Sequence, residues 1–402
     1  MVTIDAIHDA RTRIAGGVFE TPCTYSETLS AQAGNQVYLK FENLQRTGSF
    51  KDRGALNKIL TLTDVEKERG VIAASAGNHA QAVSYHAAKR GIRVQICMPL
   101  ATPLVKVSST KNYGGEVVLA GDSFDEAVQE AQRRREQFGF TLVHAFDDEA
   151  VIAGQGTIGL ELLEQVPMLD AVVVPVGGGG IVGGIACAIK HFKPNVHVIG
   201  VQTSRVPSMI KALEAHHPFT VPAASTIADG IAVRCAGRLT LPLVESYVDE
   251  MVTVEEEEIA NAILVLLERE KTLAEGAGAA GVAALLQRKT SLEGKVTVVL
   301  ICGGNIDVTV LSRIIERGLV KDGRLVRLQI SIADRPGGLK GIIDLVAKLR
   351  ANVVDLKHER AYFGVHLGET MVDIMLETRG SDHIAELTRA LEESHYPYHR
   401  VL

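Results

Sequence analysis

The feature that most constrains the fold is a continuous apolar run, Ala171-Val172-Val173-Val174-Pro175-Val176, that leads directly into a glycine-rich stretch. A strand without a polar face is typical of a sheet covered on both sides. Further short strands of this kind are predicted at 71–74, 92–97, 116–119, 196–201 and 295–301. Stretches with helical spacing separate these strands, so the chain predicts βαβ units in an α/β fold with a mostly parallel sheet.

The C-terminal residues 324–402 follow a different pattern. Apolar residues occupy every second position from 326 to 332, which predicts a strand with one solvent-facing side. The order of strands and helices that follows is βαββαβ, so we expect a small ferredoxin-like domain here.

Composition narrows the class of protein. The chain has 402 residues, of which 46% are hydrophobic and 22% charged, as in globular proteins of two or three domains. The net charge of −6 gives no basis for binding nucleic acid or a membrane surface. Five cysteines without a C-x-x-C spacing predict neither a disulfide framework nor a zinc site. With no signal pattern and no apolar run of membrane length, we expect a cytoplasmic protein.

A lysine near the start of a predicted helix is the candidate nucleophile. The strand-like run 37–42 gives way to a helix-like run at 55–62, and we expect Gly48 and Ser49 to supply the turn and the N-cap between them. Lys51 then falls in the first helical turn, where the helix dipole and burial lower the pKa of its amine. A low pKa suits an amine nucleophile. Taken alone, Lys51 is better interpreted as a surface lysine at a turn.

The glycine-rich stretch after the apolar run favours a functional role for Lys51, because it predicts an anion-binding site. Residues 177–184 contain six glycines in eight positions, and main-chain N–H groups at a helix N-terminus bind anions. Gly178, Gly180 and Gly183 satisfy the dinucleotide pattern G-x-G-x-x-G. However, the next strand ends with Gly200-Val201-Gln202-Thr203, which lacks the acidic residue that holds a ribose hydroxyl. A single phosphate fits better, and a nicotinamide-dependent oxidoreductase is the alternative from another class.

An activated lysine and a cradle for one phosphate together suggest pyridoxal phosphate. The chain resembles the fold-type II pyridoxal-phosphate enzymes (tryptophan synthase β-like), and within them the threonine dehydratases, or threonine ammonia-lyases. The matching stretches are Phe41 to Lys51, Ser75-Ala76-Gly77-Asn78-His79, Gly154 to Thr157, Gly177 to Gly180, Glu275 to Gly278 and Gly303-Gly304-Asn305. The resemblance implies a two-lobed catalytic domain over 1–320, with a small lobe at about 40–150 inserted between parts of the large lobe.

The resemblance also implies a role for each matching residue. Lys51 would form the imine with pyridoxal 5′-phosphate, and Phe50 would pack on the cofactor ring. Asn78 would bind the 3′ oxygen, and Cys302 would face the pyridine nitrogen, where the family places serine or cysteine. The other expected cofactor contacts are Gly177, Gly178, Gly179, Gly180, Ile181 and Glu275, with Asn305 also lining the site. The expected contacts of the substrate carboxylate are Ser75, Ala76, Gly77, Asn78 and His79.

The implied reaction is β-elimination from an amino acid. L-Threonine would give 2-oxobutanoate and ammonia, L-serine would give pyruvate, and Lys51 would act as the general base. A serine dehydratase or serine racemase is the nearest alternative. Racemases carry a serine as second base where this chain has Ala76, so racemisation is expected to be poor.

Residues 324–402 resemble an ACT domain, through the stretches 334–339 and 351–353. This resemblance implies allosteric control by an amino acid such as isoleucine or valine, as in isoleucine biosynthesis, within a homodimer or homotetramer. The candidate effector contacts are Gly338, Leu339 and Asn352. A purely structural role in dimerisation stays open, as does an amino-acid-sensing protein with a vestigial catalytic body.

The histidines show no H-E-x-x-H or comparable spacing, so we predict no metal centre. The resemblance leaves open a structural mono- or divalent cation in the region from Thr203 to Gly230.

Overall fold

The computed structural model describes residues 2–290, 292–359, 366 and 368–401. The chain divides into two compact units, Met1–Asp307 and Val308–Leu402, and each is described by itself. The expected boundary near residues 321–323 lies at the end of the helix that begins the second unit. Within the described residues, none of the helices combines the length and the apolar composition needed to cross a bilayer.

The first unit is built on a six-stranded sheet. In spatial order its strands are β1 (Cys23–Tyr25), β2 (Gln36–Phe41), β10 (Val296–Ile301), β7 (Ala171–Pro175), β8 (His197–Thr203) and β9 (Glu250–Val254). Every pairing is parallel except that of the edge strand β1 with β2. The apolar run predicted as a strand is β7, whose five residues are all buried. The prediction of a mostly parallel sheet is therefore confirmed.

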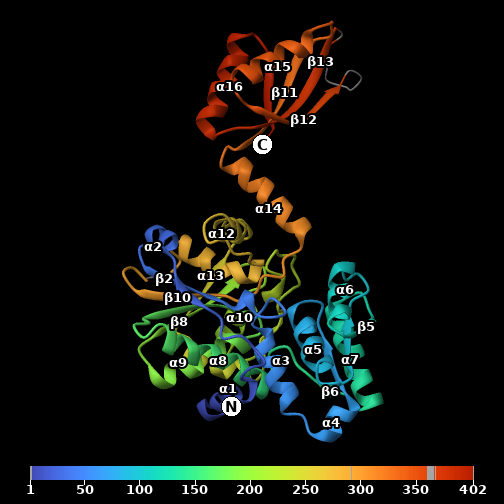
Figure 1. The fold of residues 1–402 in the computed structure, drawn as a ribbon, viewed down its shortest axis with the longest axis vertical. Helices are drawn as coiled ribbons and strands as arrows, with labels where there is room; N and C mark the ends of the chain where they lie inside the picture. The colour runs from blue at the N-terminus through green and yellow to red at the C-terminus, as the bar shows by residue number, and fades with distance from the viewer. Residues whose placement is uncertain (1, 291, 360–365, 367, 402) are drawn as a thin grey trace. The chain divides into compact units, whose positions relative to one another are not determined.

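A second, four-stranded sheet is formed by the chain between β2 and β7. Its strands, in spatial order, are β5 (Glu116–Leu119), β4 (Val94–Met98), β3 (Val71–Ala74) and β6 (Thr141–Leu142), and all pair in parallel. The helices α5 (Asn78–Ala88), α6 (Leu104–Asn112) and α7 (Phe124–Phe138) surround it (Figure 1). We call this sheet with its helices the small lobe and the remainder of the unit the large lobe.

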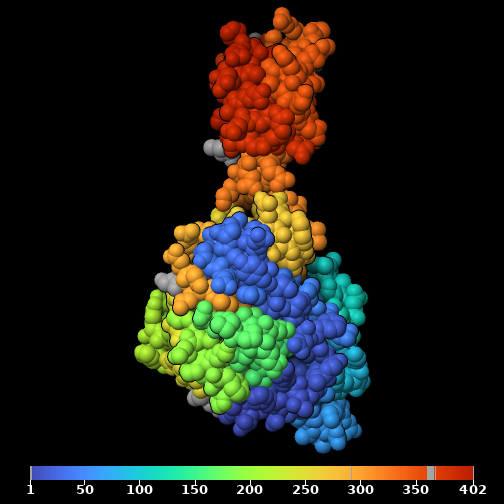
Figure 2. All heavy atoms as spheres, turned by 60° about the vertical axis from the view of Figure 1, so that its left-hand side comes forward, coloured from blue at the N-terminus to red at the C-terminus, as the bar shows by residue number. Residues whose placement is uncertain are grey.

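The remaining helices of the first unit cover the sheets. They are α1 (Ile4–Ile14), α2 (Glu27–Ala33), α3 (Lys51–Leu60), α4 (Asp64–Arg69), α8 (Glu149–Gln165), α9 (Gly180–Phe192), α10 (Ser208–Ala215), α11 (Thr240–Tyr247), α12 (Glu256–Glu268) and α13 (Gly276–Leu286), with short 3-10 turns η1 (Glu42–Leu44) and η2 (Asp229–Ile231). Figure 2 shows the dark blue surface of α1 beside the green surface of α8, where Arg11 pairs with Glu164 at 2.5 Å.

Helix α3 runs between the two lobes. Its residues Ala55 and Ile59 pack in the apolar core of the small lobe. On its other side α3 approaches α8 so closely that a Cβ on Gly154 would lie 2.7 Å from the carbonyl oxygen of Arg53. The glycines of the Gly154–Gly156 stretch are thus explained by helix packing behind the candidate lysine.

Four charged side chains are buried behind α3. Arg53 pairs with Glu42 at 2.7 Å and also with Glu161, and Lys40 pairs with Glu161 at 2.6 Å. None of the four side chains is more than 7% exposed. Burial alone opposes the charged form of Arg53, but Glu42 and Glu161 outweigh it and raise the pKa of the guanidinium. Two positive and two negative charges leave this cluster, which we call the buried quartet, neutral.

The second unit begins with α14 (Val308–Lys321) and continues as a small α+β domain. Its elements are β11 (Leu325–Ala333), α15 (Gly338–Lys348), β12 (Asn352–Glu359), β13 (Glu369–Glu377), α16 (Ser381–Glu393) and β14 (Tyr398–Val401). The sheet order is β12-β13-β11-β14, with all pairs antiparallel. The βαββαβ prediction is confirmed, although the predicted last strand included Leu402, which lies outside the described residues.

Buried and less buried residues alternate along β11, and this pattern shows which face of the sheet the helices cover. Its buried residues 326, 328, 330 and 332 face α15 and α16, and buried residues 372, 374 and 376 of β13 join them in one apolar cluster. Both helices therefore cover the same face of the sheet, as a ferredoxin-like fold requires.

Candidate active site

The candidate residues gather where three neighbouring parallel strands end. The lysine loop follows β2, Cys302 follows β10, and the glycine loop follows β7; β10 lies between the other two. The carboxyl ends of adjacent parallel strands form the crevice in which α/β proteins bind ligands. The sheet order thus brings together segments that are about 120 to 250 residues apart in the sequence.

Lys51 is the first residue of α3, which confirms its place in the first helical turn. The prediction that Ser49 caps this helix is wrong, because the N-cap is Phe50 and no side chain caps the helix there. Ser49 instead pairs through its main chain with Gly303, and its buried hydroxyl has no hydrogen-bond partner among the described residues. The main-chain N–H of Phe50 donates to the carbonyl of Cys302 at 3.0 Å. Main-chain contacts with the residues that follow β10, and not a side-chain cap, therefore set the start of the helix.

The environment of Lys51 lowers the pKa of its amine. Its Nζ donates to the carbonyl oxygen of Ala145 at 2.7 Å and lies 4.9 Å from the centre of the Phe50 ring. Burial lowers the pKa of this amine to about 8, against the opposing influence of Cys302 and Glu275. Near pH 8 a large fraction of the amine is therefore unprotonated, as a nucleophile or base requires.

The glycine loop forms a cradle of main chain with no room for side chains. Gly177 to Gly180 are buried, and Gly180 begins α9. Gly179 has a φ of +95°, and a Cβ there would come 2.5 Å from the terminal methyl of Met209. A Cβ on Gly180 would lie 2.9 Å from the carbonyl oxygen of Phe146. Main-chain N–H groups at the start of a thirteen-residue helix suit a phosphate.

The turn His144–Asp147 joins the lysine to this cradle, and the sequence analysis missed it. Ala145 accepts the hydrogen bond of the Lys51 amine. The ring of Phe146 fills the space that a Cβ on Gly178 would need. Asp147 accepts the main-chain N–H groups of residues 238 and 239 at 3.0 and 2.8 Å. The contact of Ala145 depends on a main-chain oxygen and that of Phe146 on packing, and neither produces a recognisable sequence motif.

The loop Ser75–His79 lies at the amino end of α5, as the predicted carboxylate site requires. Asn78 donates from Nδ2 to Oε1 of Glu275 at 2.7 Å and accepts from Nδ2 of Asn305 at 2.8 Å. The hydroxyl of Ser75 accepts the N–H of Gly77 at 3.2 Å. Since Asn305 also donates to the carbonyl of Thr47 at 2.7 Å, this helix end is connected to the lysine loop.

The His79 side chain is a buried, neutral group. Its Nε2 donates to the carbonyl of Val143 at 2.8 Å, and its buried Nδ1 has no partner among the described residues. Burial lowers the pKa of the imidazole to about 3. The side chain thus stays uncharged at physiological pH, and an acceptor nitrogen is left beside the site.

Burial raises the pKa values of two further ionisable groups of the site. Cys302 is 2% exposed, and burial, assisted by the charge of Glu275, raises the pKa of its thiol well above the usual range. Burial and then the charge of Asp229 raise the pKa of Glu275 to about 7, although Asn78, Lys106 and Lys51 act against that rise. A thiol that keeps its proton cannot place a negative charge beside a ring nitrogen.

Each remaining predicted residue can be located. Ile181 is buried in the first turn of α9, directly after the cradle. Gly338 and Leu339 begin α15 in the second unit, where Leu339 lines a surface depression. Asn352 begins β12, where its Nδ2 donates to Glu377 at 3.3 Å, and it is not one of the residues that line the depression. In the described part of the chain, no group of three or more His, Cys, Asp or Glu side chains could hold a metal ion.

The alternative of a dinucleotide site lacks a carboxylate at the end of β8 that could bind a ribose hydroxyl. The last residue but one of β8 is Gln202, whose Oε1 accepts the N–H groups of residues 209 and 210, each at 3.0 Å. Its Nε2 donates to the carbonyl of Val176 at 3.3 Å. The amide is thus used inside the protein, at the position where nicotinamide enzymes place a carboxylate for the ribose hydroxyl.

Comparisons with known proteins agree with this geometry. The model of the family described as "Pyridoxal-phosphate dependent enzyme" matches residues 14–303. An L-threonine ammonia-lyase of Thermotoga maritima is 50% identical over 391 residues, which cover 97% of each chain. An L-threonine ammonia-lyase of Geobacter sulfurreducens is 46% identical over 393 residues, 98% of each chain. The structure of maize serine racemase superposes with a TM-score of 0.75 and 34% identity, over 80% of this chain and 98% of that one.

The residues present fit pyridoxal phosphate. A cradle that a Cβ would fill offers main-chain donors to one phosphate, and an amine whose pKa is lowered to about 8 is connected to that cradle through Ala145 and Phe146. An aldehyde with a phosphate group needs both features. From the family match over residues 14–303 and this site together, the chain belongs to the pyridoxal-phosphate dependent enzymes.

Proposed function

We propose that this protein is an L-threonine ammonia-lyase that converts L-threonine into 2-oxobutanoate and ammonia, and that it also converts L-serine into pyruvate. The observation that carries the proposal is the similarity to two L-threonine ammonia-lyases along nearly the whole chain. In this proposal residues 1–320 form the catalytic domain, with the small lobe at about 40–150, and residues 324–402 form a regulatory ACT domain. All five cysteines are free, which supports a location in the reducing cytoplasm.

The cofactor would be held by residues from both lobes. Gly177, Gly178, Gly179, Gly180 and Ile181 would hold the phosphate, Lys51 the aldehyde carbon, Phe50 the ring, Asn78 the 3′ oxygen, and Cys302 the pyridine nitrogen. Bound there, pyridoxal phosphate supplies an electron sink for the negative charge that develops on the α-carbon. Because the Cys302 thiol keeps its proton, it acts as a neutral partner of the ring.

The chain's own groups account for binding and proton transfer. The substrate carboxylate would bind at the amino end of α5, to Ser75 and the main-chain N–H groups of residues 76 to 79, where the helix dipole favours an anion. The amine of Lys51 would take the α-proton, since burial lowers its pKa to about 8. The carbonyl of Ala145, 2.7 Å from Nζ, would orient the amine for this transfer.

Elimination is favoured over racemisation by the residue at position 76. A racemase needs a second acid–base group on the face of the substrate opposite the lysine. Ala76 offers only a methyl group within the loop that would hold the substrate carboxylate. We therefore propose that Lys51 is the only acid–base group at the α-carbon.

The experiment that tests this function is an assay of the loaded protein with each amino acid. L-Threonine is expected to give equal amounts of 2-oxobutanoate and ammonia, and L-serine is expected to give pyruvate with little D-serine. Formation of D-serine faster than pyruvate would favour the racemase alternative. Reduction of a nicotinamide cofactor without release of ammonia would favour the oxidoreductase.

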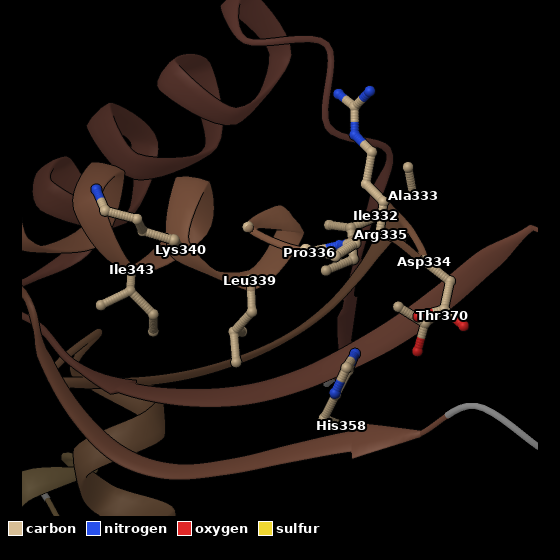
Figure 3. Close-up of a pocket in the computed structure, with 11 residues that line it drawn as sticks. Ile332, Ala333, Asp334, Arg335, Pro336, Leu339, Lys340, Ile343, His358 and Thr370 are labelled. Carbon is tan, nitrogen blue, oxygen red and sulfur yellow. The ribbon is translucent and has the colours of Figure 1, made fainter.

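Amino-acid control through the second unit is also part of the proposal. A depression of about 630 Å³ lies between the start of α15 and the sheet of this unit. The residues that line it are Ile332, Ala333, Asp334, Arg335, Pro336, Gly337, Leu339, Lys340, Ile343, His358 and Thr370. In Figure 3, Leu339 and Ile343 point from the helix toward the strands, and His358 stands opposite them on β12.

The chemistry of this depression supports an apolar amino acid as effector. Leu339 and Ile343 offer an apolar surface to a branched side chain such as that of isoleucine or valine. Arg335 offers positive charge to its carboxylate, whereas the Lys340 amine is paired with Asp344. Of the residues expected from the sequence, Leu339 belongs to this depression, Gly338 adjoins it, and Asn352 would need a different contact.

The regulatory proposal is tested by the saturation curve for threonine with and without isoleucine or valine. We expect one of them to shift the curve, and the variant Ile343→Asp to abolish the shift while the basal kcat stays within about twofold, because this residue belongs to the second unit. Lys348→Ala, on an exposed position of the same helix and outside the depression, is the matched control. A curve that neither amino acid shifts would leave the second unit with a structural role.

Two features of the proposal need their own measurements. A homodimer or homotetramer is expected in solution, and light scattering of the full chain decides between these and a monomer. A structural mono- or divalent cation near Thr203 to Gly230 is the last part of the proposal. A thermal unfolding midpoint that rises on adding K⁺ or Mg²⁺, and falls on dialysis, would support such a cation.

A further inference from the structure

Asp52, a buried acidic residue directly after the lysine, is hydrogen-bonded to Thr47 at the start of the lysine loop, residues 47–52. Asp52 is 1% exposed, and its Oδ1 accepts the hydroxyl of Thr47 at 2.8 Å. Its Oδ2 accepts the main-chain N–H of Thr47 at 3.0 Å. An acidic residue in the first turn of a helix suits the helix dipole and needs no other explanation. The third partner of Asp52 does need one.

That third partner is a buried histidine of the small lobe. Nε2 of His86 lies 3.1 Å from Oδ1 of Asp52, and each side chain is only 1% exposed. Since a carboxylate offers only acceptors, the Nε2–H of His86 is the donor. His86 belongs to α5, the helix whose amino end carries Asn78 and the proposed substrate loop. The residue beside Lys51 is thereby attached to the last turn of that helix.

A second connection joins the same two segments through Asn305. Nδ2 of Asn305 donates to the carbonyl of Thr47 at 2.7 Å and to Oδ1 of Asn78 at 2.8 Å. The N–H of Gly304 donates to the carbonyl of Gly48 at 2.9 Å. The lysine loop and α5 are thus connected twice, once through Asn305 and once through Asp52 and His86.

Apolar packing alone would not give the same constraint. Helix α3 packs on the small lobe from Ala55 onward, which is one turn beyond Lys51. Apolar contacts are non-directional, so they resist separation of two helices better than small rotations. A hydrogen bond to a buried carboxylate is directional and strong, and it acts at the position next to Lys51.

We propose that Asp52 and His86 are positioning residues, whose hydrogen bond keeps the Lys51 loop and the Asn78 end of α5 in a fixed relative orientation. The amine that would take the α-proton and the loop that would hold the carboxylate then act as one rigid constellation. Its kinetic consequence rests on the proposed lyase function, whereas its structural consequence does not. The competing interpretation is a buried pair that stabilises the fold and nothing more.

Three variants of α5 distinguish these interpretations. His86→Ala removes the donor to Asp52. His86→Gln keeps an N–H donor at about the reach of Nε2. Ser84→Ala is the matched control on the same helix, because Ser84 is fully buried and its hydroxyl has no hydrogen-bond partner among the described residues. Should His86→Ala fail to fold, Thr47→Val breaks the same chain of contacts from the lysine side with little change of volume.

The first readout is amide hydrogen exchange of the protein without cofactor. In His86→Ala we expect exchange to rise at least tenfold in residues 47–54, although the substitution lies on another helix. His86→Gln and Ser84→Ala should leave that segment within about twofold of the parent protein. Thr47→Val should also raise exchange in α5 around residue 86. A rise confined to α5 in His86→Ala, or an equal rise in Ser84→Ala, would overturn the proposal.

The second readout is turnover of threonine by the loaded protein. A misplacement of about 1 Å at the reacting groups can lower a rate by about a hundredfold. We expect kcat to fall at least tenfold in His86→Ala, and to recover to within about threefold of the parent in His86→Gln. Equal losses in these two variants would overturn the proposal. If the parent protein itself does not deaminate threonine, the lyase function fails while the exchange measurements still decide the inference.

Discussion

The amine of Lys51 donates a hydrogen bond to the main-chain carbonyl of Ala145, with 2.7 Å between the two atoms. The next residue, Phe146, packs against the glycine cradle, so a single short turn positions the amine relative to the proposed phosphate site. Lys51 and the cradle are more than a hundred residues apart in the sequence. Residues 145 and 146 therefore connect the lysine and the glycine cradle into a single site.

The cradle should not tolerate a side chain at Gly178. A Cβ there would overlap the ring of Phe146, and overpacking of this kind costs about 1–3 kcal/mol. We expect Gly178→Ala to weaken binding of pyridoxal phosphate at least tenfold, as measured by equilibrium titration of the cofactor-free protein. Gly183→Ala is the milder control, since its Cβ would lie 3.2 Å from Cβ of Leu243, against 2.4 Å from the Phe146 ring for a Cβ on Gly178. Adding Phe146→Ala to Gly178→Ala should restore part of the affinity, and an unchanged affinity in Gly178→Ala alone would contradict the cradle.

The Lys51 amine should react at lower pH than a free lysine. Burial lowers its pKa from 10.5 to about 8, so the reactive unprotonated form becomes dominant above pH 8. Acetylation by limiting acetic anhydride, followed by mass spectrometry of the peptide containing residue 51, measures this form in the cofactor-free protein. Half-maximal reactivity near pH 8 is expected. A value near 10.5 would show that the amine is solvated and not held as described.

Glu275 should make stability depend on pH. Its pKa is raised from 4.5 to about 7, mainly by burial and then by Asp229. Between these values the folded protein retains a proton that the unfolded chain has lost, so the contribution of this group to stability is full below pH 4.5 and declines until pH 7. A shift of that size corresponds to roughly 3 kcal/mol as an upper value.

The variant Glu275→Gln isolates this effect, because the amide oxygen can still accept the hydrogen bond of Asn78. Urea unfolding of the cofactor-free protein should show a gain in the free energy of unfolding of about 1–3 kcal/mol at pH 8 and little gain at pH 5. Equal differences between variant and parent at the two pH values would contradict the raised pKa.

The buried quartet should be sensitive to loss of one charge. Arg53→Met leaves Glu42 and Glu161 with one cation between them in a buried site, which typically costs about 3–5 kcal/mol. Arg133→Met removes an exposed ion pair with Glu130 and should change the stability far less, because solvent screens that pair. Neutralising Glu42 as well, in Arg53→Met with Glu42→Gln, should recover part of the loss. Similar urea midpoints for the two single variants would contradict this account.

The sequence predicted the parts of the fold that repeat a local pattern. β7 reads as a continuous apolar run because both of its faces are covered, and β11 alternates because only one of its faces is. The pattern likewise predicts the amino end of α9, since a glycine loop follows the apolar run there. The candidate lysine, the Asn78 loop and the cradle could therefore be identified before their contacts were known.

The parts that could not be predicted depend on long-range contacts. The cap expected at Ser49 is absent because the helix start is fixed by Gly303 and Cys302 on the neighbouring strand end. Ala145 contributes a carbonyl oxygen, which every residue has. Asp52 and His86 are joined across 34 residues without any periodic pattern. Such contacts become visible only when the strands are placed side by side.

The most direct test of the central claim is the position of the covalent bond to the cofactor. The loaded protein is reduced with borohydride and digested, and the peptides are analysed by mass spectrometry. We expect a phosphopyridoxyl group on Lys51 alone, and we expect none in Lys51→Ala, which should also fail to deaminate threonine. A label on a different lysine, or full turnover by Lys51→Ala, would contradict the account.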